Sequence, residues 1–270
     1  MHPRISVNAL CFPGSSLAQV SDHWRTLEAR RVSVVSLPLL EPGGREAAKA
    51  ALEGFALETI SHPFHMGHHL DPDPATWAEP RETLSRLIEF AKDLGGRSIY
   101  MVSGGRGRMG FEEAAEVYAA ALAPCLPEAK AAGIPLAVEN APALYPDSSL
   151  CHTLRDALTL AQVAGIGVCY EIFAGWTEAG LHDTIRRAMP ICPIIQVSDY
   201  VFGDRALPCR AVPGDGVIPL ERLLGWALEA GYQGAFDLEL LGPRIDREGH
   251  LAATRRAADA LGEILTRLGA

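Results

Sequence analysis

The sequence lacks the charge pattern of a protein that binds nucleic acid or a membrane surface. Its 270 residues carry 24 basic and 33 acidic side chains, for a formal net charge of −9, and no basic run or tail. Affinity for phosphate groups depends on clustered Lys and Arg side chains. We therefore expect neither nucleic acid nor a membrane as a partner.

Long apolar runs and paired cysteines are also missing. No run is long enough to span a bilayer, and the first residues, MHPRISVNAL, do not have the charged and then apolar segments of a signal peptide. The six cysteines are scattered without a CxxC pair, as expected of free thiols in a reducing compartment. These absences predict a soluble, cytoplasmic protein.

The sequence does contain a regular alternation of short β-rich runs and longer helical patterns. The β-rich runs are apolar and bounded by Gly or Pro, which is typical of buried parallel strands. Eight predicted strands cover Ile5–Leu10, Val32–Leu40, Phe55–His62, Ser98–Gly105, Ile134–Asn140, Gly167–Phe173, Pro193–Asp199 and Ala235–Leu241.

Helical patterns follow these strands, and several are followed by Gly, the usual residue just past a helix end. The predicted helices cover Leu17–Arg30, Gly44–Glu53, Thr76–Leu94, Phe111–Ala132, Ser149–Ala164, Leu181–Met189, Leu220–Ala230 and Asp246–Leu268. No Ser- or Pro-rich linker divides the chain, and no GxGxxG motif follows the first strand, so a doubly wound open sheet is the weaker alternative. We predict a single (β/α)8 TIM barrel over residues 1–270, a fold that typically takes roughly 250 residues.

Polar side chains recur near the C-terminal ends of the last four predicted strands. They are Glu139, Glu171, Gln196 and Glu239, one on each strand. Active sites of TIM barrels lie on this face, so four such residues in succession indicate a common site. Any one of them alone would more often pair with an Arg or cap a helix. Alternation places Asp237 on the same face as Glu239, either below the site or in a hydrogen-bond network.

Three carboxylates and an amide oxygen form a ligand set for a hard divalent cation. We expect Mn2+ or Mg2+, with Co2+ as a further option. Zn2+ is less suited because the set contains no His or Cys.

Four segments resemble the xylose isomerase-like TIM-barrel superfamily, which includes sugar (phosphate) isomerases and epimerases, inosose dehydratases and apurinic endonucleases. They are PLAVEN with Glu139, IIQVSD, RAVPGDGVIP, and GYQGAFDLEL with Glu239. The resemblance implies a divalent metal held by Glu139, Gln196, Glu239 and a carboxylate on the sixth strand. Gln at the third position is similar to the hydroxypyruvate isomerase branch. Glu171 stands where the family has Asp, and Ala174 where it has a substrate-contacting His.

The activity implied by the resemblance is isomerisation or epimerisation of a keto-sugar, a related hydroxy-ketone or their phosphates. The metal would stabilise an enediolate, while Glu139 and Glu239 would remove and return the proton. A lyase is the alternative, either a dehydratase or a β-eliminating enzyme acting on 3-keto-sugars or glycosides, and the departure at Ala174 keeps it open. A metal-free binding or subunit protein and a nuclease are further alternatives.

Three residues near the predicted barrel mouth are candidates for substrate binding. By resemblance, Arg210, which precedes the PGDG turn, faces the substrate oxygens. Phe173 and Trp176, just past the sixth strand, are expected to wall the substrate pocket. Relatives commonly form dimers or tetramers, so a homo-oligomer is a further expectation.

The segment SHPFHMGHH after the third strand holds His62, His65, His68 and His69. Loops at this face of a barrel commonly carry function. We expect His62 and His65 either to face the substrate or to be structural. A second metal site built from this cluster is less favoured.

Overall fold

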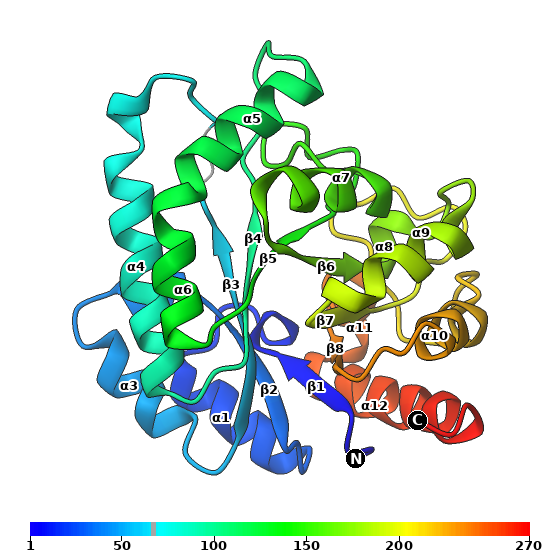
Figure 1. Ribbon diagram of the computed structural model, residues 1–270. Helices are drawn as coiled ribbons and strands as arrows, with labels where there is room; N and C mark the ends of the chain where they lie inside the picture. The colour runs from blue at the N-terminus through cyan, green and yellow to red at the C-terminus, as the bar shows by residue number, and fades with distance from the viewer. Residues whose placement is uncertain (66–68) are drawn as a thin grey trace.

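The computed structural model describes all residues except 66–68. Its strands form one closed barrel, in which each strand pairs in parallel with its neighbours in sequence and β8 pairs with β1 (Figure 1). The strands are β1 (Ile5–Asn8), β2 (Arg31–Val35), β3 (Ala56–Pro63), β4 (Ile99–Val102), β5 (Leu136–Glu139), β6 (Gly167–Glu171), β7 (Ile194–Val197) and β8 (Ala235–Leu238). The predicted TIM barrel is confirmed.

Helices surround this barrel, with the C-terminal helix lying close to β1 (Figure 1). The α-helices are α1 (Leu17–Thr26), α2 (Leu37–Leu40), α3 (Gly44–Ala51), α4 (Ala78–Asp93), α5 (Phe111–Leu122), α6 (Leu126–Ala132), α7 (Leu154–Ala164), α8 (Ile172–Gly175), α9 (Leu181–Ala188), α10 (Leu220–Glu229), α11 (Pro243–Glu248) and α12 (His250–Arg267). The 3-10 helices are η1 (Ala9–Cys11), η2 (Pro74–Thr76), η3 (Ala123–Cys125) and η4 (Met189–Ile191).

Pro and Gly interrupt several predicted elements. The predicted helix 111–132 is divided by η3, because Pro124 has no N–H group for a helical hydrogen bond. The last predicted helix is divided at Gly249, whose φ is 92°. The second strand is predicted to extend to Leu40, but residues 37–40 form α2, with Pro38 in its first turn, where proline is tolerated.

The helix predicted from Ser149 begins only at Leu154. Thr153 caps it, because its side chain accepts a hydrogen bond from Asp156 N while the Asp156 carboxylate accepts one from Thr153 N. This capping box fixes the start of the helix. The preceding residues therefore form a long loop after β5, at the C-terminal end of the barrel.

Side chains on the strands alternate between the barrel interior and the layer beneath the helices. The interior contains a small buried cluster of Tyr100, Ala137, Cys169, Ile194 and Ala235. Because side chains two residues apart share a face, Glu139, Glu171 and Gln196 also point inward, nearer the C-terminal end. The outward side chains join the main core with the helices.

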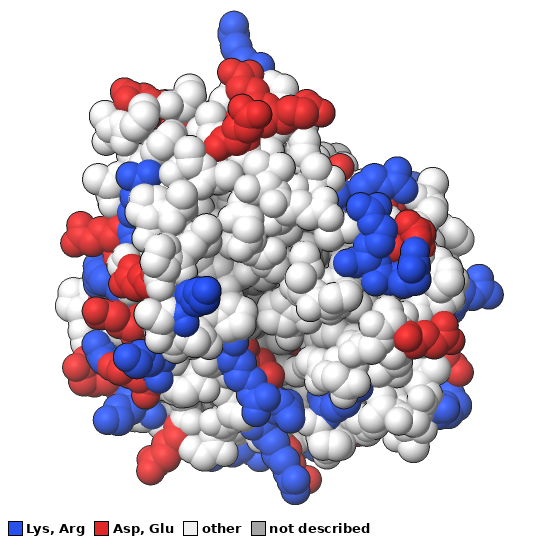
Figure 2. All heavy atoms as spheres, in the orientation of Figure 1, with Lys and Arg blue, Asp and Glu red and all other residues white. Residues whose placement is uncertain are grey.

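None of the helices in the described part of the chain is long and apolar enough to cross a membrane. On the face shown in Figure 2, Lys and Arg side chains are interspersed with Asp and Glu side chains. That face therefore carries no extended patch of only positive or only negative charge.

Candidate active site

The ends of β5 to β8 bring buried polar side chains to the barrel mouth. Glu171 is in register with Gln196, and Gln196 with Asp237. Glu171 and Gln196 are fully buried, and Glu139 and Glu239 keep only 7% and 6% of their surface exposed. Their positions follow from the inward-facing alternation on four neighbouring strands.

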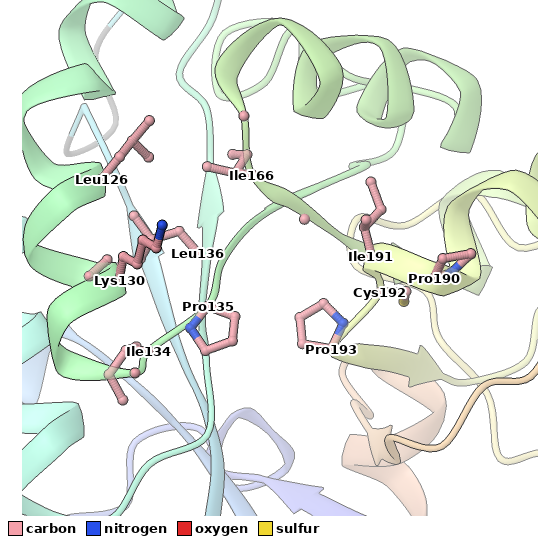
Figure 3. A pocket seen from close by; sticks show the side chains of 14 residues that line it. Leu126, Lys130, Ile134, Pro135, Leu136, Ile166, Pro190, Ile191, Cys192 and Pro193 are labelled. Carbon is pink, nitrogen blue, oxygen red and sulfur yellow. The ribbon is translucent and has the colours of Figure 1, made fainter.

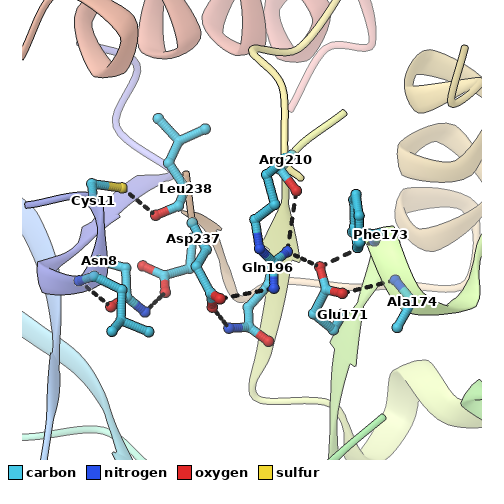
Figure 4. A network of polar contacts seen from close by, with 12 residues as sticks. Asn8, Cys11, Glu171, Phe173, Ala174, Gln196, Arg210, Asp237 and Leu238 are labelled. Carbon is cyan, nitrogen blue, oxygen red and sulfur yellow. Dashed lines mark hydrogen bonds and ion pairs between the residues drawn. The ribbon is translucent and has the colours of Figure 1, made fainter. Parts of the chain in front are cut away.

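Arg210 pairs with Glu171 (Figure 4) and also with Glu239. Its Nη1 lies 2.7 Å from Glu171 Oε1, and its Nη2 lies 2.8 Å from Glu239 Oε1. Nη1 also donates to Ser198 Oγ at 3.2 Å, a contact that the sequence did not indicate. Burial lowers the pKa of Arg210, but the charges of Glu171 and Glu239 outweigh burial and raise it above its ordinary value, so the guanidinium stays charged.

Glu171 also accepts hydrogen bonds from the start of α8. Its Oε1 accepts from Phe173 N at 3.0 Å, and its Oε2 accepts from Ala174 N at 2.7 Å. Burial raises the pKa of Glu171, while Arg210 opposes that shift. This carboxylate therefore caps a helix and anchors an arginine.

Gln196 contacts Glu239 through its side-chain amide. The same amide nitrogen donates to the Tyr100 hydroxyl at 3.0 Å, and Gln196 Oε1 accepts from Cys169 Sγ at 3.2 Å. Tyr100 is a residue of the site that no sequence motif indicated. The signal was its inward position on β4, which alternation would have revealed.

Glu139 differs from the other carboxylates. Among the described residues, none donates a hydrogen bond to it or pairs with it. Burial raises its pKa well above the ordinary value, and the charges of Glu239 and Glu171 add to that shift, while Arg210 opposes it. Its carboxylate thus lies in a region where negative charge is poorly compensated.

Asp237 belongs to a separate hydrogen-bond network. The sequence left two placements open for it, below the site or in such a network, and the structure shows the network. Asp237 accepts from Asn8 Nδ2 and Ser33 Oγ, each at 2.8 Å, and Ser6 Oγ lies 3.0 Å from Ser33 Oγ. Burial raises the pKa of Asp237 to about 7, against the effect of these hydrogen bonds. The network links β8 to β1 and β2.

Asp199, just past β7, holds the loop that carries Arg210. Its carboxylate accepts hydrogen bonds from four backbone N–H groups at 2.8–3.0 Å: those of Tyr200, Gly214, Gly216 and Ile218. Its backbone exchanges two 2.8 Å hydrogen bonds with Ala211. The IIQVSD and PGDG segments thus form one structural unit, a role that their resemblance did not reveal.

A cavity of about 320 Å³ opens above these residues, with Glu139, Arg210 and Glu239 in its wall. Apolar side chains from the loops and strand ends around the barrel mouth contribute much of the remaining wall. They include Leu10, Val102, Pro142, Phe173, Leu207 and Leu241. The cavity thus combines buried charges with an apolar surround.

Phe173 and Trp176 occupy different positions. Phe173 lines the cavity, with its ring centre 5.0 Å from the Arg210 guanidinium carbon. Trp176 packs near Tyr200, with ring centres 6.4 Å apart, and is not among the lining residues. Its role in substrate binding stays a prediction.

The histidines at the end of β3 and in the segment after it do not line this cavity in the part of the chain that is described. His62 is fully buried, with Nδ1 3.0 Å from Ser36 Oγ. His65 stacks edge-on against Phe64, and His69 bridges to Gly105 through its backbone. His68 lies outside the described residues. A substrate-binding role for His62 and His65 stays a prediction.

The donors at the barrel mouth fit a hard cation in part. Glu139 and Glu239 supply carboxylate oxygens, and an uncompensated buried carboxylate such as Glu139 favours a nearby cation. Gln196 Oε1 faces Cys169 while its Nε2 faces Glu239, so Gln196 would be a ligand only with its side-chain amide turned over. Glu171 fits less well, because three donors already occupy its oxygens. Across the described residues, no three His, Cys, Asp or Glu side chains are grouped so as to hold a metal ion.

A larger cavity of about 720 Å³ lies at the opposite end of the barrel (Figure 3). It is bounded by residues that lead into β5, β6 and β7, including Ile134, Pro135, Ile166 and Pro193. Lys130 is the one charged residue in its described lining. It contains none of the predicted site residues and lies away from the face that carries activity in this fold.

Comparison with protein families matches residues 22–264 to the family described as xylose isomerase-like TIM barrel. The chain belongs to this family. The family resemblance of its motifs is thereby confirmed, while the likeness of Gln196 to the hydroxypyruvate isomerase branch stays a prediction. A comparison with curated proteins gives no match.

Several solved structures share the fold. The IolI protein with a binding zinc atom is 14% identical, with a TM-score of 0.81 over 98% of this chain and 99% of that one. L-ribulose 3-epimerase is 20% identical, with a TM-score of 0.79 over 98% and 95%. A Mycobacterium smegmatis xylose isomerase-like TIM barrel protein in complex with magnesium is 16% identical, with a TM-score of 0.73 over 99% and 98%. At these identities the likeness shows the fold.

Proposed function

We propose that this protein is a divalent-metal-dependent isomerase or epimerase of a keto-sugar or related hydroxy-ketone. The observation that carries the proposal is the pair of buried carboxylates, Glu139 and Glu239, facing one cavity beside the charged Arg210. The family match supports it, as do structural neighbours that include an epimerase and proteins with bound zinc or magnesium.

Glu139 and Glu239 would carry the proton. One carboxylate takes it from the carbon beside the carbonyl, and the other returns it. Such a division of roles requires different environments for the two groups. The environments of the two carboxylates differ, because Arg210 pairs directly with Glu239 but not with Glu139.

Glu139, Gln196 and Glu239 would hold the cation, for which Mn2+ or Mg2+, and also Co2+, suit the oxygen donors. When bound, the cation would act as a Lewis acid toward the carbonyl and its neighbouring hydroxyl. Arg210 adds a fixed positive charge that favours negative charge developing on a substrate oxygen. Glu171 as a fourth ligand stays a prediction.

The test is exchange of the substrate proton with deuterated solvent, followed by NMR across a panel of keto-sugars with Mn2+ present. Glu139→Gln and Glu239→Gln should each slow exchange by about 10²–10⁴-fold, because each removes one proton carrier. Glu46→Gln, on the exposed face of α3, is the matched control and should leave the rate unchanged. Unchanged exchange in Glu139→Gln would refute the proposal, and a new enone absorbance with loss of substrate would favour the lyase.

A further inference from the structure

The cavity at the barrel mouth is charged at its floor and apolar at its rim. The floor consists of Glu139, Arg210 and Glu239, each no more than 7% exposed. The rim, defined as Leu10, Val102, Pro142, Phe173, Leu207 and Leu241, comes from loops and strand ends around the barrel. The charged floor suits a polar part of a ligand, and the apolar rim suits an apolar part.

An unsubstituted sugar would place hydroxyl groups against this rim. Buried hydroxyls need hydrogen-bond partners, and losing those made with water weakens binding. Beyond the charged floor, the polar residues of the wall are Ser61, Tyr100, Tyr145 and Ser148. The Tyr100 hydroxyl already accepts a hydrogen bond from Gln196. The wall therefore offers few partners for a fully hydroxylated chain.

We infer that the substrate carries an apolar substituent, of the size of one aromatic ring or a short alkyl chain, beside its reacting hydroxy-ketone. The inference rests on the proposed function, which places the reacting end at the charged floor. The substituent would cover apolar rim surface such as that of Leu207, which is 41% exposed. A cavity of about 320 Å³ matches one small substituent beside the reacting group.

The experiment compares two sugars that cannot react, methyl β-glucoside and phenyl β-glucoside, by NMR titration of the wild-type protein. The phenyl compound should bind at least about tenfold more tightly, because its ring leaves water for the rim. Leu207→Ser should reduce this preference to about threefold or less, since it replaces rim surface with a hydroxyl.

Val102→Thr is the second rim variant and adds a hydroxyl with little change of volume. The matched control is Leu144→Ser, because Leu144 is 69% exposed, lies in the loop after β5 and does not line the cavity. It should keep the wild-type preference. Equal affinities for the two glucosides, no binding of either, or an unchanged preference in both rim variants would overturn the inference.

The titration needs no turnover, so its result is separate from that of the exchange assay. A clear phenyl preference without proton exchange would reject the proposed reaction and keep the apolar subsite. Proton exchange on an unsubstituted keto-sugar, together with equal glucoside affinities, would reject the subsite and keep the reaction.

Discussion

At Glu171, two roles compete for the same pair of oxygen atoms. Each carboxylate oxygen can accept about two hydrogen bonds. Oε1 already accepts from Phe173 N and from Arg210 Nη1, and Oε2 accepts from Ala174 N. Holding Arg210 in place is therefore the role that these contacts support, and binding a metal would draw on the one remaining acceptor position of Oε2.

Replacing Glu171 with Gln separates these roles. If Glu171 positions Arg210, Mn2+ affinity should stay within about threefold, while KM should rise by about tenfold or more, because a buried arginine loses a charged partner. Calorimetric titration with Mn2+ and steady-state kinetics measure the two effects. A loss of Mn2+ affinity with an unchanged KM would instead identify Glu171 as a ligand.

His62 permits a prediction about acid stability. Burial, and then the charge of His65, lowers the pKa of His62 from 6.5 to about 4. The unfolded chain therefore binds a proton between these pH values that the folded chain does not, so stability falls as pH drops through this window. Between pH 7 and pH 4.5, the free energy of unfolding should fall by roughly 2 kcal/mol less in His62→Asn than in the wild type.

Urea unfolding at the two pH values measures that difference. His69→Asn is the control, because His69 is exposed and its contact with Gly105 is made by the backbone. It should show the pH dependence of the wild type. An equal pH dependence in His62→Asn and the wild type would show that His62 does not titrate in this window.

At the scale of elements, the loop between β7 and α10 depends on Gly216. A Cβ atom there would lie 2.2 Å from Tyr200 O and 2.3 Å from Asp199 Oδ1. Gly216→Ala should therefore destabilise the fold by about 1–3 kcal/mol and raise KM, because the same loop carries Arg210. Thermal unfolding and kinetics check both effects.

Gly225→Ala is the matched control for this substitution. Gly225 lies within α10, and an added Cβ would meet only Leu268 Cδ2, at 3.6 Å. The change should be neutral or stabilise the protein by up to about 1 kcal/mol, because alanine favours helix. Similar unfolding of the two variants would contradict the role assigned to Gly216.

Strand alternation was the most informative element-scale signal. It predicted that Asp237 and Glu239 share a face, because the period of two is set by strand geometry itself. The same period accounts for the inward direction of Glu139, Glu171 and Gln196 in the structure. It did not predict where helices break, as at Pro124 and Gly249. There a local backbone restriction overrides the apolar pattern.

For the whole molecule, eight alternating units were enough to predict a closed barrel, and the parallel pairing confirms it. The contacts of Arg210 were not predictable in the same way. Its partners Glu171 and Glu239 lie 39 residues before it and 29 after it in the sequence, and the pairing of β6, β7 and β8 side by side brings them together. The four ligands predicted from the strand ends therefore did not take account of Arg210. Its positive charge pairs with two of them, Glu171 and Glu239.

A cation at the barrel mouth should stabilise the whole fold. A ligand that binds only the folded state adds about 2.7 kcal/mol at a concentration 100 times its Kd, so Mn2+ should raise the melting temperature and EDTA should reverse the rise. In a Glu139→Gln, Glu239→Gln double variant the shift should vanish, because two of the three proposed ligands are lost. Glu46→Gln should keep it. If the wild type showed no shift with Mn2+, Mg2+ or Co2+, a metal-free binding protein would explain the fold and cavity better than a metal-dependent isomerase.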